Sequence, residues 1–507
     1  MTAIHDEADN QLHQRTLDGF REQGYEVLDA SAEQGSSCAI TGRANDSEVV
    51  LTERLHQALR RLNPAVSQDL LEQAREQLTQ NYSLRELAAA NQDVYRLLTY
   101  GIKLDIASPA AAQVRGTSEE KVTVQVIDWK NPQNNNFLLV TGLSINGQLG
   151  RGRLDYVGFV NGLPLLLPVV RASGRQQDRL RRLYDLVEKD YKQRFPQLFW
   201  YNALILLSDG QHSKMGSMAT TWEHFVEWKR VEREDEPENT TLETLLKGTC
   251  ARGRLLDIVE NFTLFKPVAG GLLKIVARCH QYLGVNAAFA RMQRIKELDG
   301  KIGVFWHTQG AGKSYSMIFF EQKVQHKLSG NWTFVVVTDR EDLDKQIYEN
   351  FAQIGVISEP QERVRATSRD ELKRLLRENH SIIFTLIQKF QTEQPQQPYP
   401  KLSDRDDIIV MTDEAHRSQY DTLAANMRTA LPNASFIGFT GTPLIDREEH
   451  ETRETFGPYI SKYPFLQAIR DGVTVPLIYE NRTPEIELQV AEVAEAIQEM
   501  ERRTGLS

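Results

Sequence analysis

The hydrophobic pattern of the chain consists of short, unbroken apolar runs separated by longer amphipathic stretches. The apolar runs are LPLLLPVV (163–170), IGVFW (302–306), FVVV (334–337), IIFT (382–385), IIVM (408–411) and FIGF (436–439). Runs of this length without polar alternation are typical of strands that are buried on both faces. Helical stretches such as ELKRLLREN (371–379) lie between them, so the pattern predicts an α/β fold.

Breaks in the pattern indicate the domain organisation. The charged, proline-containing stretch VEREDEPENTT (231–241) predicts a linker. After it, residues 242–294 mix apolar and polar positions with few helix breakers, so we expect helices there. The predicted division is an amino-terminal domain over 1–235, a linker and helical lead-in over 236–300, a second α/β domain over 301–475, and the start of a further connection over 476–507.

Composition narrows the class of protein. The 507 residues are 40% hydrophobic and 25% charged, which suits about three domains. The start MTAIHDEADNQ has no basic or apolar signal segment, and no apolar run reaches membrane-spanning length, so we expect a cytoplasmic protein. Cys38, Cys250 and Cys279 form no CxxC pair, which argues against a zinc site and a disulfide framework.

The charge balance leaves nucleic acid open as a partner. The net charge is −9, but DNA motors contact phosphates through local basic grooves that the total hides. The stretch RASGRQQDRLRR (171–182) concentrates five arginines. Two interpretations are open for this stretch: a DNA contact, or the solvated face of a helix.

The most informative stretch is HTQGAGKS (307–314), which follows one apolar run and leads into the helix-like run YSMIFF (315–320). Glycines let the backbone turn its N–H groups toward an anion, Lys313 can reach the β/γ-phosphates, and the Ser314 hydroxyl can ligate Mg²⁺. His307 stands where the general pattern has its first glycine. Taken alone, the stretch could also be an ordinary loop. The predicted nucleotide-binding residues of the loop are Gln309, Gly310, Ala311, Gly312, Lys313 and Ser314.

Two further strands end in residues that would complete such a site. The run IIVM delivers Asp413 and Glu414 at its carboxyl end, where parallel α/β sheets place their chemistry. We expect Asp413 to hold Mg²⁺ and Glu414 to polarise the attacking water. His416 is expected to couple nucleotide state to neighbouring elements. The next strand ends in Thr440, Gly441 and Thr442, to which we assign a role in coupling hydrolysis to movement.

The ordered set HTQGAGKS, FVVVTDREDLDKQ (334–346), IIFTLIQKF (382–390), DEAH and FTGTP resembles the first motor domain of superfamily 2 helicases. The chain is also similar to the amino-terminal half of the restriction (R) subunit of type I restriction–modification enzymes. Three segments carry this similarity: HQYLGVNAA (280–288), VVTDREDLDKQ (336–346) and TFGPYISKYPFLQAIRDGVTVPLIYENR (455–482). The resemblance implies that Gln281 reads the adenine. The alternative is a solvent-facing helix residue.

This resemblance implies a fold and a function for each domain. Residues 1–235 would form a PD-(D/E)xK-type nuclease-like domain, and residues 301–475 a RecA-like motor domain. The expected activity is ATP-dependent translocation of double-stranded DNA coupled to DNA cleavage, with ATP and Mg²⁺ as cofactors. The expected partners are double-stranded DNA and the modification and specificity subunits of a type I restriction complex.

The nuclease pattern is incomplete in this chain. Asp155 and the segment NGLPL (161–165) are in place, and Asp155 is the expected metal ligand. The family has Glu-x-Lys at the end of the following strand and a Gln four residues before a Tyr. Here these positions carry Val169, Arg171 and Val187, the last before Tyr191. Valine cannot bind a metal and arginine is a poor base. We therefore expect an inactive nuclease, unless another acid substitutes or the register is wrong.

The carboxy-terminal end of the sequence affects the expected rate of ATP hydrolysis. After AIRDGVTVP (468–476) the chain stops at Ser507, without sequence for the second RecA-like domain that the resemblance calls for. We therefore expect this chain alone to bind ATP but hydrolyse it weakly, so that either it is a fragment or a separate chain completes the motor. Two alternative functions stay open. One is a truncated, non-enzymatic relic or regulator that binds ATP or DNA, or competes for the restriction complex. The other is a stand-alone superfamily 2 helicase or remodeller.

Overall fold

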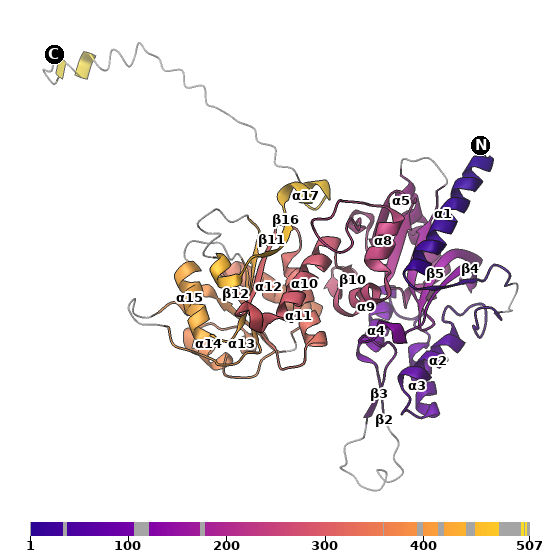
Figure 1. The fold of residues 1–507 in the computed structure, drawn as a ribbon, viewed down its shortest axis with the longest axis horizontal. Coiled ribbons are helices and arrows are strands. Elements are labelled where there is room, and N and C mark those ends of the chain that lie inside the picture. The colour runs from indigo at the N-terminus through magenta and orange to yellow at the C-terminus, as the bar shows by residue number, and fades with distance from the viewer. Residues whose placement is uncertain are drawn as a thin grey trace, which may run out of the picture.

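The computed structural model describes residues 2–33, 38–105, 121–172, 178–357, 359–392, 399–413, 420–442, 452–475, 498–500 and 502–503. The chain folds into two lobes, each built on a six-stranded sheet (Figure 1). Helices and strands alternate through the carboxy-terminal lobe, and the amino-terminal lobe combines a mixed sheet with covering helices. The predicted α/β class is confirmed.

The amino-terminal lobe contains a sheet in the order β1-β4-β5-β6-β7-β8. Its strands are β1 (Glu26–Asp29), β4 (Phe137–Gly147), β5 (Gly150–Val160), β6 (Leu163–Val170), β7 (Leu204–Ser208) and β8 (Ser213–Gly216). β1 runs parallel to β4 and β6 parallel to β7, whereas the other neighbours are antiparallel. Every residue of β6 is buried, as its unbroken apolar sequence predicts.

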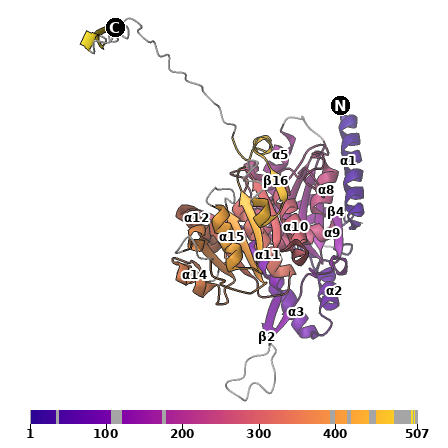
Figure 2. The same cartoon turned by 60° about the vertical axis from the view of Figure 1, so that its left-hand side comes forward.

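Helices surround this sheet, and α1 forms an outer face of the lobe (Figure 2). The helices are α1 (Thr2–Glu22), α2 (Thr52–Leu62), α3 (Gln68–Leu78), α4 (Leu87–Tyr100), α5 (Arg179–Leu186), α6 (Lys192–Arg194) and α7 (Pro196–Phe199). A pair of short antiparallel strands, β2 (Ile102–Asp105) and β3 (Lys121–Val124), projects from the lobe (Figure 1).

The lead-in between the lobes differs from the expectation of helices alone. It contains α8 (Leu242–Thr249), α9 (Arg252–Asn261) and α10 (Cys279–Met292), but residues 263–276 form an antiparallel hairpin of β9 (Thr263–Val268) and β10 (Gly271–Val276). The expectation of helix is therefore wrong for this stretch. Gly270 and Gly271 adopt φ of 94° and 143°, a backbone conformation that glycine tolerates and that closes the hairpin.

The carboxy-terminal lobe contains a fully parallel sheet in the order β13-β12-β14-β15-β11-β16. Its strands are β11 (Lys301–His307), β12 (Thr333–Thr338), β13 (Ile382–Leu386), β14 (Ile408–Asp413), β15 (Ser435–Thr440) and β16 (Tyr459–Tyr463). Its helices are α11 (Lys313–Lys327), α12 (Glu341–Ile354), α13 (Gln361–Val364), α14 (Arg369–Leu375), α15 (Tyr420–Ala430) and α17 (Phe465–Arg470). Apart from residues 163–170, which form β6 of the other lobe, the apolar runs identified in the sequence are β11 to β15 of this sheet.

The two lobes share one hydrophobic core. A single cluster of buried side chains runs from Leu12 in α1 through the lead-in to Phe439 in β15. At the junction the ring of Tyr282 lies 5.5 Å from Trp228 and 4.7 Å from Phe262, between ring centroids. The helices α9 and α10 accordingly lie between the two sheets in both views (Figure 1, Figure 2). Across the described ranges, no helix combines the length and apolarity needed to cross a bilayer.

Candidate functional site

The carboxyl ends of three neighbouring strands bring the predicted motifs together. β15 lies between β11 and β14 in the sheet, and all three run in the same direction. Thr440 at the end of β15 is paired with Trp306 of β11, and Asp413 at the end of β14 is paired with Phe439. The glycine loop, Asp413 and Thr440 therefore leave the same edge of the sheet, which is where parallel sheets bind ligands.

The glycine loop has the backbone that its sequence predicts. Gly310 and Gly312 have φ of 86° and 82°, in the left-handed region that favours glycine. Gly312 precedes the first residue of α11, Lys313, so the free N–H groups of the first turn of this 15-residue helix face the loop and favour an anion. Ser314 lies in the same turn, and Lys313 Nζ donates to the carbonyl oxygen of His307 at 3.4 Å.

Gln281 lies directly against this loop. Its side-chain Nε2 donates to the Gly312 carbonyl at 3.1 Å, and its Oε1 accepts from the Arg278 backbone N–H at 2.9 Å. A Cβ on Gly312 would lie 2.7 Å from Gln281 Nε2. Gln281 is only 4% exposed, so the interpretation as a solvent-facing helix residue is wrong. The helix α10 holds the amide next to the loop.

Two buried imidazoles support the loop from below. His280 Nε2 lies 3.2 Å from the Ala311 carbonyl, and its ring stacks on Tyr463 with centroids 3.9 Å apart. Burial lowers the pKa of His280 to about 4. His307 is fully buried and its Nε2 lies 2.5 Å from Ser461 Oγ. Burial lowers its pKa well below the ordinary value, with help from the charge of Lys313. Both rings are therefore neutral at pH 7.

A cavity of about 340 Å³ opens beside the loop. One wall is Gly310, Ala311 and Gly312 together with Gln281, Arg278 and Tyr315; the other comes from residues 215–226 of the amino-terminal lobe and from β10. Within the described ranges, no carboxylate lies in ion-pair distance of Arg278, and burial lowers its pKa. The sequence analysis did not predict that Arg278, Tyr315 and the second wall line this cavity. Of these, only Arg278 could have been proposed from the sequence, because it stands three residues before Gln281.

The remaining motor residues are placed as follows. Asp413 is 7% exposed at the end of β14. Thr440 Oγ1 donates to the Thr442 carbonyl at 3.0 Å and accepts from the Thr442 N–H at 3.3 Å, which folds the chain around Gly441 into a compact turn. Gln309 is exposed at the tip of the glycine loop. Glu414 and His416 lie outside the described residues.

The nuclease-like positions also lie together, on β5 and just after β6. Arg171 places a guanidinium nitrogen 3.2 Å from Asp155 Oδ2, and both side chains are about half exposed, at 47% and 46%. Burial raises the pKa of Tyr191 to about 12, and the charge of Asp155 adds to the effect. Val169 and Val187 are buried in the core, at 3% and 1% exposure. A cation therefore sits in front of the carboxylate, and the two neighbouring positions are apolar.

No metal-binding cluster compensates for these replacements in the described part of the chain, where no group of three or more His, Cys, Asp and Glu side chains has the geometry to hold a metal ion. The fold also brings Asp9 to this place, where its carboxylate accepts from the Ala172 backbone N–H at 2.8 Å and its charge acts on Arg171. The arginine cluster after β6 is partly paired: Arg181 lies 3.3 Å from Asp185 and 4.0 Å from Glu223. This pairing is typical of a solvated helix face.

Comparison with known proteins identifies the family. Residues 8–224 match the type I restriction enzyme R protein amino terminus, and residues 280–505 match the SWI2/SNF2 ATPase family. The chain is 35% identical, over 93% of its length, to the type I restriction enzyme HindI endonuclease subunit of Haemophilus influenzae. The chain belongs to the family of type I restriction enzyme R proteins.

Other R proteins and related structures extend this relationship. The chain is 33% identical, over 88% of its length, to the type I restriction enzyme MjaIXP endonuclease subunit of Methanocaldococcus jannaschii. It spans 46% of the Haemophilus protein and 44% of the Methanocaldococcus protein. A fragment structure of an HsdR subunit of a type I restriction enzyme from Vibrio vulnificus YJ016 aligns with 64% of this chain and 52% of its own, at 16% identity and a TM-score of 0.28. The assignment to the R protein family rests on the sequence relationships.

Family membership accounts for both lobes. The R protein amino-terminal match covers the lobe built on the mixed sheet, and the SWI2/SNF2 match covers the parallel sheet together with α10. The SWI2/SNF2 ATPase region implies the use of ATP. In this R protein the match to the SWI2/SNF2 ATPase family begins at His280, so Gln281 lies inside the matched region.

Proposed function

We propose that this R protein uses ATP hydrolysis to move double-stranded DNA within a type I restriction complex. The observation that carries the proposal is the convergence of the glycine loop, Asp413 and Thr440 at the carboxyl ends of three adjacent parallel strands. Phosphates would lie over the loop and the amino-terminal end of α11, where the helix dipole and free N–H groups attract negative charge.

The roles of the individual side chains follow from their chemistry. Lys313 would contact the β/γ-phosphates, and the Ser314 hydroxyl and the Asp413 carboxylate would hold Mg²⁺, which prefers oxygen ligands and would neutralise phosphate charge. Glu414, the residue after Asp413, polarises the attacking water. The base enters the cavity beside Gln281, where Arg278 and Tyr315 add a cation and an aromatic ring. Thr440, Gly441, Thr442 and His416 couple the nucleotide state to movement.

We propose further that the amino-terminal lobe of this chain has lost metal-dependent cleavage. Such a nuclease needs carboxylates around a divalent metal and a base for the water. The guanidinium of Arg171 lies against Asp155 and stays protonated. Val169 and Val187 offer no ligand. What remains of the lobe is its apolar fold, which supports the motor through the shared core.

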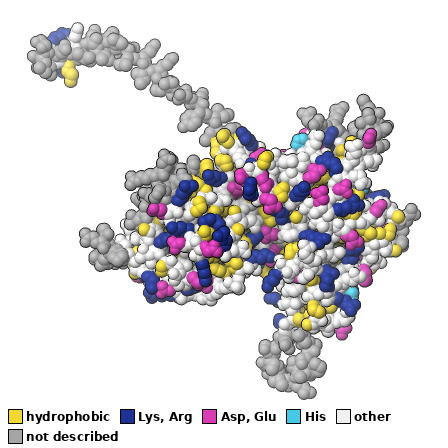
Figure 3. All heavy atoms as spheres, in the orientation of Figure 1, with side chains coloured by type: hydrophobic (Ala, Val, Ile, Leu, Met, Phe, Trp, Pro, Cys, Tyr) yellow, Lys and Arg dark blue, Asp and Glu magenta, His cyan; other side chains and the backbone are white. Residues whose placement is uncertain are grey.

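Double-stranded DNA and the modification and specificity subunits are the proposed partners. On the face seen in Figure 3, basic and acidic side chains are interspersed, and no wide area of a single charge stands out. This pattern fits a motor that contacts phosphates through local groups inside a larger assembly. Capture of the chain by a methyltransferase–specificity complex would distinguish an R protein from a stand-alone helicase.

The proposal is tested with Lys313→Ala. We expect ATP binding to weaken about 100-fold, because losing one partner of a buried charge contact costs about 3 kcal/mol. The binding of a fluorescent ATP analogue measures this. Lys345→Ala is the matched control, because Lys345 is exposed and lies 4.0 Å from Glu349 on α12. Glu414→Gln should keep binding and lose DNA-stimulated turnover. If Lys313→Ala binds ATP as the wild type does, the loop is not a phosphate site.

A further inference from the structure

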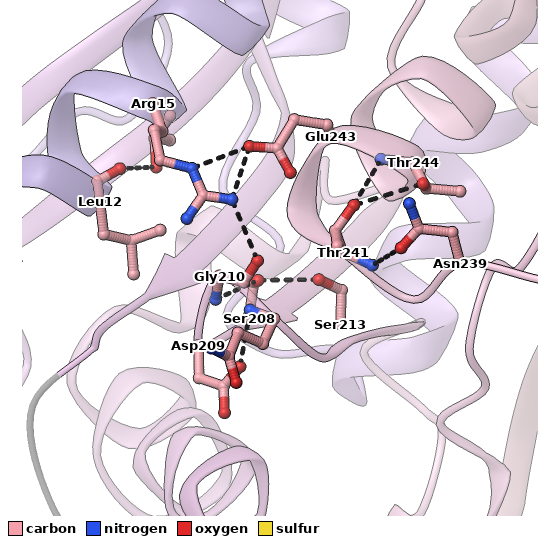
Figure 4. A network of polar contacts seen from close by, with 12 residues as sticks. Leu12, Arg15, Ser208, Asp209, Gly210, Ser213, Asn239, Thr241, Glu243 and Thr244 are labelled. Carbon is pink, nitrogen blue, oxygen red and sulfur yellow. Dashed lines mark hydrogen bonds and ion pairs between the residues drawn. The ribbon is translucent and has the colours of Figure 1, made fainter.

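The segment that leaves the amino-terminal lobe, residues 229–243, is fastened to that lobe at its far end. Arg15 of α1 donates to the Glu243 carboxylate at 2.9 and 2.7 Å and to the Gly210 carbonyl at 3.3 Å (Figure 4). Thr241 caps α8 by accepting from the Thr244 N–H. Residues 231–241 of this segment were predicted to be a linker. Glu243, two residues beyond them, binds α1 of the amino-terminal lobe.

The middle of the same segment is fastened to the motor. The Glu234 carboxylate accepts one hydrogen bond from the Ser461 hydroxyl and another from the Lys462 backbone N–H, the latter at 2.7 Å. Both donors belong to β16, the edge strand next to β11. Burial raises the pKa of Glu234, while these two hydrogen bonds act in the opposite direction. A single side chain therefore joins the segment to the strand beside the glycine loop.

The hydrogen bonds continue from Ser461 into the glycine loop. Because the Ser461 proton points to Glu234, the Ser461 oxygen accepts from His307 Nε2–H, and the two atoms lie 2.5 Å apart. His307 is the first residue of the loop, and its carbonyl accepts from Lys313 Nζ. Ser461 and His307 are 2% and 0% exposed, so water cannot replace a lost partner.

A second route runs parallel to the first. Lys229 Nζ lies 2.5 Å from Asp471 Oδ1, and Asp471 Oδ2 accepts from the Tyr463 hydroxyl at 2.6 Å. The Tyr463 ring stacks on His280, whose Nε2 lies 3.2 Å from the Ala311 carbonyl. Both routes start in residues 229–234 and end at two different residues of the same glycine loop, His307 and Ala311.

We propose that Glu234 and Ser461 are positioning residues that transmit the docking of segment 229–243 to the glycine loop. The amino-terminal lobe then sets the affinity of the motor for ATP. When Glu234 is docked, His307 is held in one tautomer and orientation, and the loop has the shape that receives phosphates. When Glu234 leaves β16, the buried Ser461 hydroxyl loses its acceptor, its proton is no longer held away from His307, and the loop relaxes. This proposal rests on the proposed function of the loop as a phosphate site.

Coupling of this kind is reciprocal. If docking strengthens ATP binding, ATP must strengthen docking by the same factor. The relevant reporter is the backbone amide of Lys462, which donates to Glu234. Its hydrogen exchange should slow in the presence of saturating ATP.

The experiment compares Glu234→Ala, Ser461→Ala and the double variant in the full chain, with ATP affinity as the readout. We expect each single variant to bind ATP about tenfold more weakly, because it leaves buried polar groups without a partner. The double variant should be no weaker than the weaker single variant, because both interrupt one route. Asp235→Ala is the matched control: it removes the same charge from the neighbouring position, where Asp235 is 73% exposed and pairs with Arg233 at 2.9 Å.

The outcomes separate this proposal from the function on which it rests. If the wild type binds ATP, Lys313→Ala does not, and Glu234→Ala binds as the wild type does, the coupling is overturned while the phosphate site stands. If the wild type does not bind ATP, or Lys313→Ala binds it unchanged, the phosphate site itself is wrong. Should Glu234→Ala fail to fold, exchange of the Lys462 amide in the wild type decides: slowing by ATP supports the coupling, and unchanged exchange overturns it.

Discussion

The two six-stranded sheets of this R protein are both built from apolar strands but carry different side chains at the carboxyl ends of those strands. In the parallel sheet, the strand ends carry Lys313 after β11, Asp413 after β14 and Thr440 on β15. In the mixed sheet, the corresponding strand ends carry Val169 and Arg171, with Val187 in the adjoining helix. Apolar strands build both sheets, and the groups proposed to contact ATP lie at the strand ends of the parallel sheet.

This difference shows that the fold does not depend on the catalytic groups. Val169 is 3% exposed and Val187 is 1% exposed. A glutamate at such a position would be a desolvated carboxylate, which is unfavourable unless a metal or a cation compensates it. Valine removes this penalty and adds to the apolar core. The mixed sheet is therefore stable without a metal, and the motor sheet gains from the core that both lobes share.

The largest expected effect comes from restoring the family's residues at the three replaced positions, which would remove the difference in chemistry between the two sheets. We expect the triple variant Val169→Glu, Arg171→Lys and Val187→Gln to nick supercoiled DNA in the presence of Mg²⁺. The expected gain over the wild type is roughly 10²–10⁴-fold, the usual contribution of a positioned general base. Agarose-gel assays of plasmid nicking measure it.

The control for this gain is Asp155→Ala in the restored background, which should abolish the new activity because it removes one of the two carboxylates that would hold the metal. A restored variant that melts at the wild-type temperature but does not nick DNA would show that more than these three positions are missing. Nicking by the wild type that depends on Asp155 would contradict the loss of activity.

A second, smaller effect concerns a buried histidine of the motor and the way in which its protonation changes the stability of the fold with pH. Burial lowers the pKa of His326 on α11 to about 4, against an ordinary value of about 6.5. Above pH 6.5 neither the folded nor the unfolded state carries this proton. Between pH 6.5 and 4 the unfolded state binds it and the folded state does not, so stability falls by about 1.4 kcal/mol per pH unit.

His326→Gln should remove this share of the pH dependence, since glutamine does not titrate and can still reach the Asn261 amide, which lies 2.8 Å from His326 Nδ1. Urea unfolding of the motor lobe at pH 6.5 and 5.0 checks it. The variant should lose about 2 kcal/mol less than the wild type over this interval. Equal losses would show that His326 takes up its proton in the folded state.

The smallest expected effect concerns the ion pair of the mixed sheet. Asp155→Ala in the otherwise unchanged chain should alter the free energy of unfolding by less than about 1 kcal/mol, because the Asp155 and Arg171 side chains are both about half exposed and solvent screens their attraction. Chemical denaturation measures the change. A loss of several kcal/mol would mean that the pair holds the sheet together, and the idea of a fold independent of its former site would need revision.

Local sequence was sufficient for much of the fold and of the motor site. The apolar runs identified β11 to β15 of the parallel sheet, because a strand buried on both faces leaves no polar alternation. The glycine loop was predictable because its conformation depends on residues next to one another, as the φ values of Gly310 and Gly312 confirm. The hairpin of residues 263–276 was missed, since its short apolar strands read equally well as parts of helices.

The family and the α/β class of this protein were determined by the sequence alone, because motifs and apolar periodicity are local properties. Only the tertiary structure placed Arg171 against Asp155, Gln281 against Gly312, and Glu234 against Ser461. Glu234 and Ser461 are separated by 227 positions in the sequence, and no local pattern announces such a pair. Contacts of this kind depend on how the lobes pack around their common core, and that packing is a property of the whole chain.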